Sequence, residues 1–436
     1  MVSSAAGDHH HVTGWRCAVC SAVVDIATDF PWRCPNATAT DRHHLLQMVQ
    51  ADTSRASSSI STPDAQFAWA GHAAANGMSL ADRMEMVSRL NSAVGAVAGT
   101  DFTPTPFARS AELSDALGFT SAGGVWVKDE TGGVAGSQKA RHLFPILLHL
   151  QAVEAFGRLP ERPPLAIASC GNAALAAATL ARAARWPIEV YVPTWMSDGF
   201  GVQLDRLGAD VRRCERLRDD PPGDPAMLRF REAVEGGAIP FTVQGPENAL
   251  CLDGGRTIGW EISEQLSSAG IDSVDRVFVQ VGGGAFATCL GAGLSLQHPS
   301  ARLHAVQTAG CAPLVRAWQR AKELDLGPDD VAHHWGQVMT VWEQPQSLAD
   351  GILDDETYDW IGVFAAMTAS GGSPIESPEA DVITAHELAR SAGFDVSATG
   401  SAGLAGLMSA LRSGASSGDP IGASERVVVV MSGIER

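Results

Sequence analysis

Short apolar runs rich in β-branched residues alternate with longer amphipathic stretches from about residue 100 to the end of the chain. The runs have the length and composition of buried strands. Between them, stretches such as NAALAAATLARAAR and TIGWEISEQLSSAG repeat apolar residues every three to four positions, as helices do. The predicted strands are residues 125–128, 165–168, 188–192, 277–281, 303–307 and 426–431. This alternation predicts an α/β fold with mostly parallel sheets flanked by helices.

The chain before residue 100 follows a different pattern. Residues 51–64, ADTSRASSSISTPD, predict a polar linker. Ser79, with Asp82 three residues later, predicts the N-cap of a helix over residues 79–94. We therefore expect a small cysteine-containing segment, residues 1–50, ahead of a larger domain, residues 51–436.

Composition narrows the class of protein. The 436 residues, 45% of them hydrophobic, are enough for two or three domains with real cores. The net charge of −18 opposes binding to nucleic acid or to anionic lipid. The longest apolar runs are far shorter than the roughly 20 residues that span a bilayer, and the polar N-terminus does not resemble a signal peptide. We expect a cytoplasmic protein with no nucleic-acid or membrane partner.

Three of the eight cysteines lie close together near the N-terminus, in WRCAVC and WRCPN. Cys17, Cys20 and Cys34 indicate a small zinc knuckle, which needs a fourth ligand for tetrahedral geometry. Ala37 stands where a second Cys-x-x-Cys would place that ligand, so His43 or His44 would have to supply it. A metal-free ribbon is the alternative. The other cysteines are scattered, which favours reduced thiols over a disulfide framework.

Lys139 is the first candidate for chemistry, in a chain with only three lysines. It follows the Gly-rich turn TGGVAGSQ and precedes an apolar helical run, with Ser137 available to cap the helix. An amine at a helix N-terminus has its charged form disfavoured, which suits a lysine that forms an imine. Lys322 has the pattern of a surface lysine, and Lys128, beside Asp129 and Glu130, that of an ion-pair partner.

Two further loops follow predicted strands, where ligands gather in parallel sheets. SCGNA, residues 169–173, opens a helix whose N-terminus favours anions, although Asn172 could simply cap that helix. VGGGA ends a strand and starts another helix, which is typical of a phosphate cradle. It also matches the dinucleotide pattern at Gly282, Gly284 and Ala287, but the next strand ends in Gln307 where a ribose-binding acid is expected.

A fourth loop carries Thr399, in ATGSAG, whose hydroxyl could meet a ring nitrogen or act as an N-cap. A poised lysine, a phosphate cradle, an asparagine loop and a late hydroxyl together indicate pyridoxal phosphate (PLP), which needs an imine lysine, a phosphate site and a partner for its ring nitrogen.

At this point the chain resembles the tryptophan-synthase-β, or fold-type II, PLP enzymes, from about Thr103 to the C-terminus. The motifs that carry the resemblance are, in order, TPTPF, VKDETGGVAGSQKAR, SCGNAA, LGAD, GGRTIGWEI, VQVGGGA, HAVQTAGCAPLVRAW, ADGILDDETYDW, ATGSAGLAGL and VVVVMSG. GCAP and ILDDETYDW make threonine synthase the nearest member. The resemblance implies a two-subdomain catalytic domain with a smaller mobile subdomain at about residues 145–245, and a homodimer.

The resemblance also implies residue roles. Lys139 would hold the cofactor as an imine and then move protons, and Asn172 would bond the cofactor's 3′ oxygen. Thr399 would face the pyridine nitrogen. The cofactor phosphate would lie on Gly282, Gly283, Gly284 and Ala285. The amino-acid substrate would be held by Ser169, Cys170, Gly171 and Ala173, with Arg141.

The chain departs from the family pattern in places. SQKARH replaces the usual SFKDRG-like sequence and keeps Arg141, and Ala285 replaces the fourth glycine of the phosphate loop. The lysine that threonine synthases usually have near the substrate phosphate is missing after VPTWMSDGFGVQLDRLGAD, where Arg206 could substitute.

The first hypothesis is a PLP lyase that acts at the β or γ carbon of an amino acid, with threonine synthase, which converts O-phosphohomoserine to threonine, the nearest activity. The second is a hydroxyamino-acid dehydratase, an ammonia-lyase or a β-replacement enzyme. A nicotinamide oxidoreductase, a non-catalytic relative and a zinc-bearing interaction protein are alternatives from other classes. Gln307 argues against the oxidoreductase, and Lys139 argues against the other two.

Overall fold

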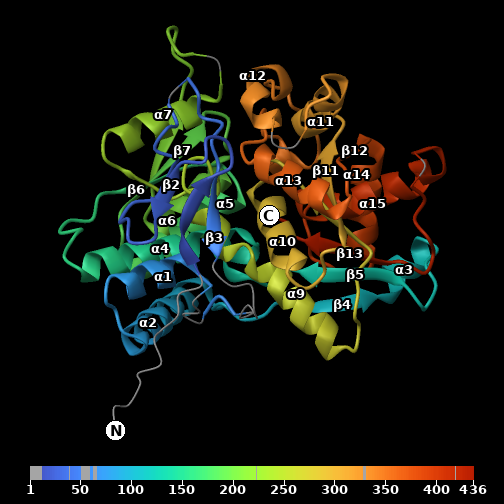
Figure 1. The fold of residues 1–436 in the computed structure, drawn as a ribbon, viewed down its shortest axis with the longest axis horizontal. Helices are drawn as coiled ribbons and strands as arrows, with labels where there is room; N and C mark the ends of the chain where they lie inside the picture. Colours follow the sequence, from blue (N-terminus) through green and yellow to red (C-terminus); the bar gives the residue numbers. More distant parts are fainter. Residues whose placement is uncertain are drawn as a thin grey trace.

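The computed structural model describes residues 12–38, 40–50, 59–61, 66–221, 223–327, 330–417 and 419–436. The predicted linker, residues 51–64, lies mostly outside these ranges. Two mainly parallel sheets flanked by helices lie side by side, one with β6 and β7 and the other with β5, β10, β11 and β13 (Figure 1). The predicted α/β class is therefore confirmed.

The larger sheet has six strands in the order β12-β11-β10-β13-β5-β4, all parallel except β4, which runs antiparallel to β5. Its strands are Ile375–Ser377, Arg302–Thr308, Arg276–Gln280, Arg426–Met431, Gly124–Asp129 and Phe107–Ser110, in that spatial order. The smaller sheet is fully parallel, in the order β8-β7-β6-β9. Its strands are Asp210–Cys214, Ile188–Pro193, Leu165–Ala168 and Ile239–Pro240.

All six predicted strands are confirmed, and the four strands that the pattern missed are the edges of the two sheets: β4, β8, β9 and β12. Edge strands are short and carry charged or proline residues, which prevent sheets from pairing with other chains. β8, DVRRC, and β9, Ile-Pro, show both features. Their sequences therefore lack the buried apolar signal.

The helices cover both sheets. The helix predicted over residues 79–94 is α2, and the Ser79 hydroxyl accepts a hydrogen bond from the Asp82 N–H as expected. α4 is deeply buried on all sides and packs against α5 and α8. The helices are α1 Ala68–Ala75, α2 Leu80–Ala98, α3 Ala111–Ala116, α4 Lys139–Ala155, α5 Asn172–Ala184, α6 Asp198–Leu207, α7 Pro225–Glu235, α8 Cys251–Gly254, α9 Thr257–Ser268, α10 Ala285–Ser295, α11 Pro313–Glu323, α12 Trp335–Val338, α13 Trp360–Ser370, α14 Glu379–Ser391 and α15 Ala398–Ser417. Short 3-10 helices lie at Val134–Gly136, Val331–His334 and Asp350–Ile352.

The N-terminal segment forms a small antiparallel sheet of its own. Its strands are β1 Val12–Cys17, β2 Val23–Asp25 and β3 Leu46–Gln50, in the order β2-β1-β3. The segment packs on the smaller-sheet half, where the Asp29 carbonyl lies 2.7 Å from His149 Nε2 and the Trp32 carbonyl accepts from the Ala249 N–H. It is therefore docked on the helices beside the smaller sheet.

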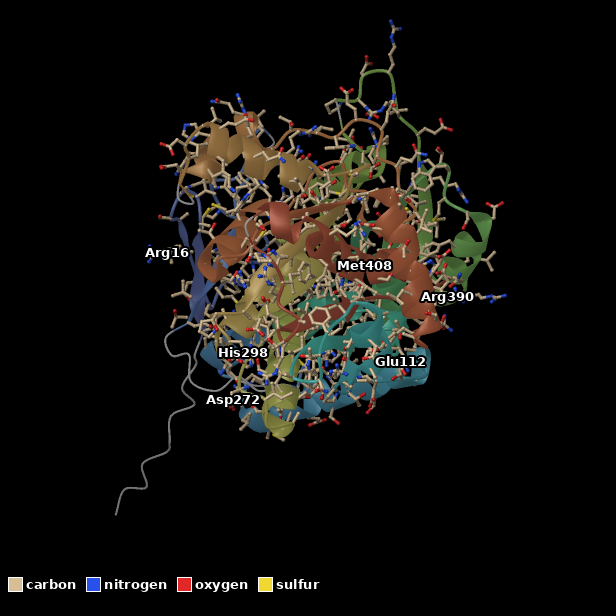
Figure 2. The ribbon with its side chains drawn as sticks, turned by 90° about the vertical axis from the view of Figure 1, so that its right-hand side faces the viewer. Arg16, Glu112, Asp272, His298, Arg390 and Met408 are labelled. Carbon is tan, nitrogen blue, oxygen red and sulfur yellow. The ribbon has the colours of Figure 1, made fainter. Side chains whose placement is uncertain are left out.

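The surface carries the charge that the composition predicts. Charged residues from distant elements, such as Arg16, Glu112 and Arg390, are exposed at the rim of the molecule (Figure 2). Within the described residues, none of the helices combines the length and the apolar character needed to span a bilayer.

Candidate active site

Lys139 is the first residue of α4, directly after a loop that pairs with the end of the larger sheet. Ser137 bridges Gly433, the Gln138 N–H donates to the Ser432 carbonyl at 3.1 Å, and the Ile434 N–H donates to the Gly136 carbonyl at 2.9 Å. Gln138 occupies the N-cap position, and the Ser137 hydroxyl accepts from the Lys139 N–H at 3.4 Å. The loop is therefore held from the carboxyl end of β13, where parallel sheets place their ligands.

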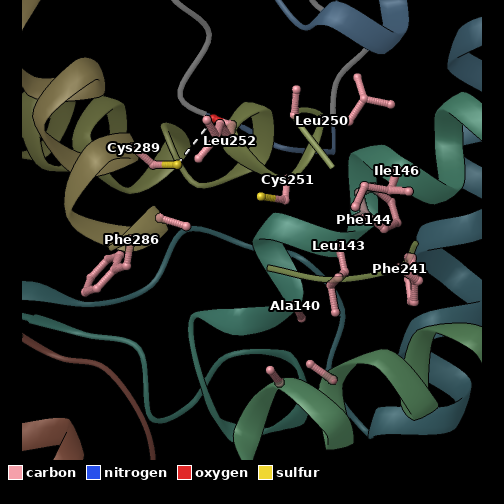
Figure 3. Close-up of a cluster of buried hydrophobic side chains, with 14 of the residues drawn as sticks. Ala140, Leu143, Phe144, Ile146, Phe241, Leu250, Cys251, Leu252, Phe286 and Cys289 are labelled. Carbon is pink, nitrogen blue, oxygen red and sulfur yellow. Dashed lines mark hydrogen bonds between the residues drawn. The ribbon is translucent and has the colours of Figure 1, made fainter. Parts of the chain in front are cut away.

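The start of α4 is fixed by an apolar cluster that it shares with α8 and α10. Ala140, Leu143 and Phe144 of α4 lie in one cluster with Cys251 and Phe286 (Figure 3). The fit is tight, because a Cβ on Gly254 would lie 2.9 Å from the Arg141 carbonyl carbon. Since α10 begins at the glycine loop, this packing fixes the lysine relative to that loop.

Lys139 is half-buried, and the contacts of its amine differ from those of the fully buried Lys128. Among the described residues, none lies within hydrogen-bonding or ion-pair distance of Lys139 Nζ. Lys128 Nζ instead donates to Glu261 at 2.6 Å, to Gln265 at 3.0 Å and to the Thr105 carbonyl at 2.9 Å. Lys128 therefore forms an ion pair, as its sequence context indicated. Its partner is Glu261 of α9 and not the adjacent Asp129 or Glu130.

Burial lowers the pKa of Lys139, and the nearby carboxyl groups of Asp354 and Asp359 oppose that shift. A lowered pKa leaves more of the amine neutral near pH 7, and the neutral amine is the nucleophile that forms imines. An unpaired, partly neutral lysine can attack a carbonyl group.

Arg141 does not face a substrate. Its guanidinium donates to Glu130 at 2.8 and 3.0 Å and to Glu261 at 2.6 and 3.0 Å, and also reaches the hydroxyls of Thr257 and Thr105. The side chain is buried and each of its nitrogens already has an acceptor. A substrate-binding role for Arg141 is therefore not supported, because no donor remains for a carboxylate.

The glycine cradle, residues 282–285, joins β10 to α10. Gly284 is the N-cap with φ 96°, and no side chain caps the helix. A Cβ on Gly282 would lie 2.5 Å from Asp354 Oδ2 and 2.9 Å from Ile352 Cα, so only glycine fits there. N–H groups without a side-chain cap at a helix start favour anions, so the predicted phosphate site at this loop stays a prediction.

Asp354 lies at this cradle and was not singled out by the sequence analysis. Its Oδ2 lies 3.5 Å from the position of a Cβ built on Gly283, and burial raises the pKa of Asp354 to about 6 against the opposing effect of Lys139. Asp359, five residues later, is buried, accepts from the Gly245 N–H at 3.1 Å, and donates its own N–H to the Gly283 carbonyl at 2.7 Å. The acidic motif LDDETYDW was the available signal, but its spacing alone does not reveal these contacts.

The asparagine loop lies between β6 and α5. Gly171 is the N-cap, its N–H donates to the Ser169 hydroxyl at 3.3 Å, and Ala173 is buried in the first turn. Asn172 does not cap the helix; its Oδ1 accepts from Arg436 Nε at 2.8 Å. Because Oδ1 is engaged, the amide group is oriented with Nδ2 as its remaining donor.

Cys170 shares this loop. Burial, together with the negative charges of Asp224 and Asp350, raises the pKa of Cys170 to about 11. The thiol is therefore protonated at neutral pH, which agrees with a packing role and not with a nucleophile.

Two hydroxyl groups are candidates for a ring partner. Thr399 lies in the first turn of α15, where its hydroxyl accepts from the Gly351 N–H at 2.9 Å and lies 3.3 Å from Asp350 Oδ1. Ser432, which the sequence analysis did not assign, is buried at the end of β13 and accepts from Gln280 Nε2 at 2.5 Å. The Ser432 carbonyl accepts a hydrogen bond from the N–H of Gln138, the residue before Lys139. The signal for Ser432 was the MSG that ends the last strand.

Gln307 has a structural role. Its side-chain oxygen accepts from the N–H groups of Leu314 and Val315, and its nitrogen donates to the Val281 carbonyl and to Thr357. It therefore supports the start of α11 and the base of the cradle, so the sequence position expected of a ribose-binding acid serves packing.

The arrangement defines an α/β enzyme with a free lysine beside an anion cradle, at the carboxyl ends of parallel strands. The lysine can form an imine with an aldehyde, the cradle fits a phosphate, and the Asn172 amide can donate to an oxygen between them. These groups fit PLP.

The chain belongs to the pyridoxal-phosphate dependent enzyme family, whose model matches residues 100–433. This membership excludes the nicotinamide alternative as the class of the catalytic domain. No curated protein matches the chain.

Solved structures show the same fold. Threonine deaminase isoform 2 of Solanum lycopersicum is 18% identical with a TM-score of 0.59, over 82% of this chain and 86% of that one. Maize serine racemase is 17% identical with a TM-score of 0.57, over 80% and 93%. Diaminopropionate ammonia lyase of Escherichia coli is 15% identical with a TM-score of 0.60, over 80% and 89%.

Proposed function

We propose that this protein is a PLP-dependent lyase that removes a leaving group from the β or γ carbon of an unphosphorylated amino acid. The observation that carries the proposal is the unpaired Lys139 amine beside the glycine cradle, with carboxyl groups as its charged neighbours. A half-buried lysine without a structural partner among the described residues is explained by chemistry.

Four parts of the chain would hold the cofactor. Lys139 would bind it covalently, residues 282–285 would bind its phosphate, and Asn172 Nδ2 would donate to its 3′ oxygen. Ser432 is a better partner than Thr399 for the ring nitrogen, because it is buried next to the lysine loop while the Thr399 hydroxyl is held by Gly351 and Asp350. When bound, PLP withdraws electrons from the substrate's α carbon. Lys139 would then move the proton at that carbon.

The substrate's carboxylate would lie at the start of α5, on the N–H groups of residues 172 and 173, where no side chain caps the helix. The charged groups that act on Cys170 in the same loop are Asp224, Asp350 and Asp354. Carboxylates repel a phosphate ester but tolerate a hydroxyl or an amino group as the leaving group. This charge pattern supports the dehydratase or ammonia-lyase alternative.

Threonine synthase is the second candidate, supported by the motifs GCAP and ILDDETYDW. It requires a cation for the substrate phosphate, and Arg206 does not suit that role. Arg206 is exposed in the last turn of α6, which leads into the first residue of β8. That end of the helix lies at the amino edge of the strands, opposite the substrate loop. The named activities of the solved relatives, threonine deaminase and ammonia lyase, also favour the first proposal.

The test combines a spectrum with a product assay. We expect the purified chain with added PLP to show a visible absorption band that Lys139→Ala abolishes or shifts, while Lys322→Ala, a surface control, retains it. We expect release of ammonia and a 2-oxo acid from L-serine, L-threonine or 2,3-diaminopropionate.

Phosphate and threonine formed from O-phospho-L-homoserine instead would establish threonine synthase. A chain that stays colourless with PLP would overturn both candidates.

A further inference from the structure

Three cysteines and one histidine of the N-terminal segment come together at one end of its sheet. This N-terminal cluster consists of Cys17, Cys20, Cys34 and His44, whose ligand atoms all lie within 4.8 Å of one another. Cys17 Sγ lies 3.3 Å from His44 Nδ1, and Cys20 Sγ lies 3.4 Å from Cys34 Sγ. Tetrahedral zinc with sulfur and nitrogen ligands needs separations of about 3.6 to 3.8 Å, so small shifts complete the geometry.

The local fold brings these ligands together. Cys17 ends β1, and a tight turn, closed by the Ser21 N–H on the Cys17 carbonyl at 3.1 Å, brings Cys20 beside it. Cys34 starts a second turn, closed by the Ala37 N–H at 3.0 Å. β3 runs antiparallel to β1 with Leu46 opposite Cys17, so His44 reaches the place that Ala37 leaves without a ligand.

The surroundings of the cluster are those of metal-bound thiolates. The N–H of Val19 points at Cys17 Sγ at 3.4 Å, and the N–H of Asn36 points at Cys34 Sγ at 3.4 Å. The Asn36 side chain adds a donor to Cys20 Sγ at 3.3 Å. Donors of this kind stabilise negative sulfur.

An acid completes the outer contacts. Asp41 Oδ2 lies 3.5 Å from His44 Nε2. A carboxylate at that distance favours the proton on Nε2, which leaves the Nδ1 lone pair free for a metal.

The neighbouring His43 serves a different purpose. Its Nδ1 accepts from Trp360 Nε1 at 3.2 Å, its Nε2 lies 3.2 Å from Glu356, and its ring stacks on Trp335 at 4.2 Å. The choice between His43 and His44, which the sequence left open, is therefore made by the fold. His44 faces the cysteines, and His43 faces the catalytic domain.

Residues 354–360 connect this contact to the active site. The Glu356 carboxylate also forms an ion pair with Arg42 at 2.7 Å. In the same short segment, Asp354 Oδ2 lies 2.5 Å from the position of a Cβ built on Gly282, and the Asp359 N–H donates to the Gly283 carbonyl at 2.7 Å. The segment is thus held by residues 42–43 on one side and closes the glycine cradle on the other.

We propose that the N-terminal cluster binds one structural zinc ion, which fixes residues 42–43 and thereby holds residues 354–360 against the glycine cradle. The bonds formed are three zinc–sulfur bonds and one zinc–nitrogen bond, and the thiol protons pass to solvent. The ion has no part in the reaction, and its presence does not depend on the identity of the substrate or of the cofactor.

The first measurement is the metal content of the full chain by elemental mass spectrometry. We expect one zinc per chain in the parent and in His43→Gln, and a loss of at least tenfold in affinity in His44→Gln and Cys34→Ser. Cys214→Ser, which alters a buried thiol in β8 outside the cluster, is the matched cysteine control. A parent that takes up no zinc under reducing conditions, or His44→Gln that retains it while His43→Gln loses it, would overturn the assignment.

Cobalt replacement tests the ligand set without any variant. The parent loaded with Co²⁺ should show intense tetrahedral and thiolate-to-cobalt absorption bands, and weak octahedral bands would contradict a Cys₃His site.

Hydrogen exchange tests the connection to the cradle, in protein without cofactor. We expect the amides of residues 354–360, Asp359 above all, to exchange faster after chelation of zinc or in His44→Gln, and to be unchanged in Cys214→Ser. Unchanged exchange after zinc loss would show that the ion stabilises only the N-terminal segment and does not hold residues 354–360. A failed PLP spectrum leaves both readouts intact, so the two proposals fail separately.

Discussion

At the scale of single residues, three neighbouring cations show how environment decides between structure and chemistry. Lys128 and Arg141 share Glu261, and both have their donors satisfied. Lys139, two residues before Arg141, has no such partner among the described residues. A partly desolvated charge without a partner is costly, so the pKa of the Lys139 amine is lowered toward the neutral form that imine formation needs.

The Arg141 network yields the first prediction. Arg141→Lys removes the paired bonds to Glu130 and Glu261, because an ammonium cannot donate in a fork. We expect a loss of at least about 2 kcal/mol in the free energy of unfolding, measured by denaturant titration. In the fraction that stays folded, KM for the amino-acid substrate should change less than twofold. A raised KM at unchanged stability would restore Arg141 to the substrate site.

The raised pKa of Asp359 predicts that the free energy of unfolding depends on pH. Burial raises its pKa to about 8, whereas an unfolded Asp titrates near 3.8. The folded state therefore holds a proton that the unfolded state has lost between these values, so stability is greatest at low pH and is lost as pH rises toward 8. Asp359→Asn cannot ionise and should lose less stability between pH 5 and pH 8.

Between pH 5 and pH 8, the free energy of unfolding of the parent should fall by at least about 1.4 kcal/mol more than that of Asp359→Asn, the equivalent of one pKa unit. The measurement is urea unfolding of both proteins at the two pH values. Asp115→Asn, at an exposed position in α3 outside the site, is a control that should follow the parent. Parallel curves for Asp359→Asn and the parent would contradict a raised pKa.

At the scale of elements, the loop that starts α10 is shaped by what packs on it. A Cβ on Gly282 would meet a carboxyl oxygen at 2.5 Å and backbone at 2.9 Å, whereas one on Gly283 would meet side chains alone, the Tyr358 ring at 3.3 Å and Asp354 Oδ2 at 3.5 Å. Backbone cannot move away as a side chain can. The two glycines are therefore unequal, although the sequence presents them as equivalent.

This inequality gives a matched pair of variants. Gly282→Ala should weaken PLP binding at least tenfold, because residues 352–354 must shift out of the cradle, while Gly283→Ala should cost less than about threefold. Absorbance titration with PLP measures both. Equal losses would indicate that the cradle adjusts as one unit.

At the scale of the whole molecule, the two sheets meet through the end of the chain. Residues 432–434 bond the lysine loop, and Arg436 crosses to Asn172 at the start of α5, in the half of the molecule that holds the smaller sheet. Because Arg436 also donates to the Ala135 carbonyl, it joins the asparagine loop to the lysine loop. The predicted mobile subdomain, at about residues 145–245, includes all strands of that sheet, and its motion stays a prediction.

Removal of this tie is the last prediction. Arg436→Ala should free the Asn172 amide to rotate, so that affinity for PLP falls severalfold and the absorption band shifts, with little change in global stability. Arg426→Ala, an arginine at the start of β13, is the control. An unchanged band and affinity would show that Asn172 is oriented without Arg436.

The sequence by itself determined the elements whose signal is local. Buried strands carry their own apolar runs, so all six central strands were predictable, and helix α2 was marked by Ser79 and Asp82. Lys139, the glycine loop and the N-terminal cysteines were also visible, because each needs a residue type that is rare in its context.

Only the tertiary structure decided how these parts meet. Edge strands, the engagement of Arg141, the approach of Asp354 to the cradle and the choice of His44 over His43 depend on contacts between residues far apart in the chain. A local pattern carries no information on such contacts, because the same polar residue can pair, cap or bind a ligand according to what packs beside it.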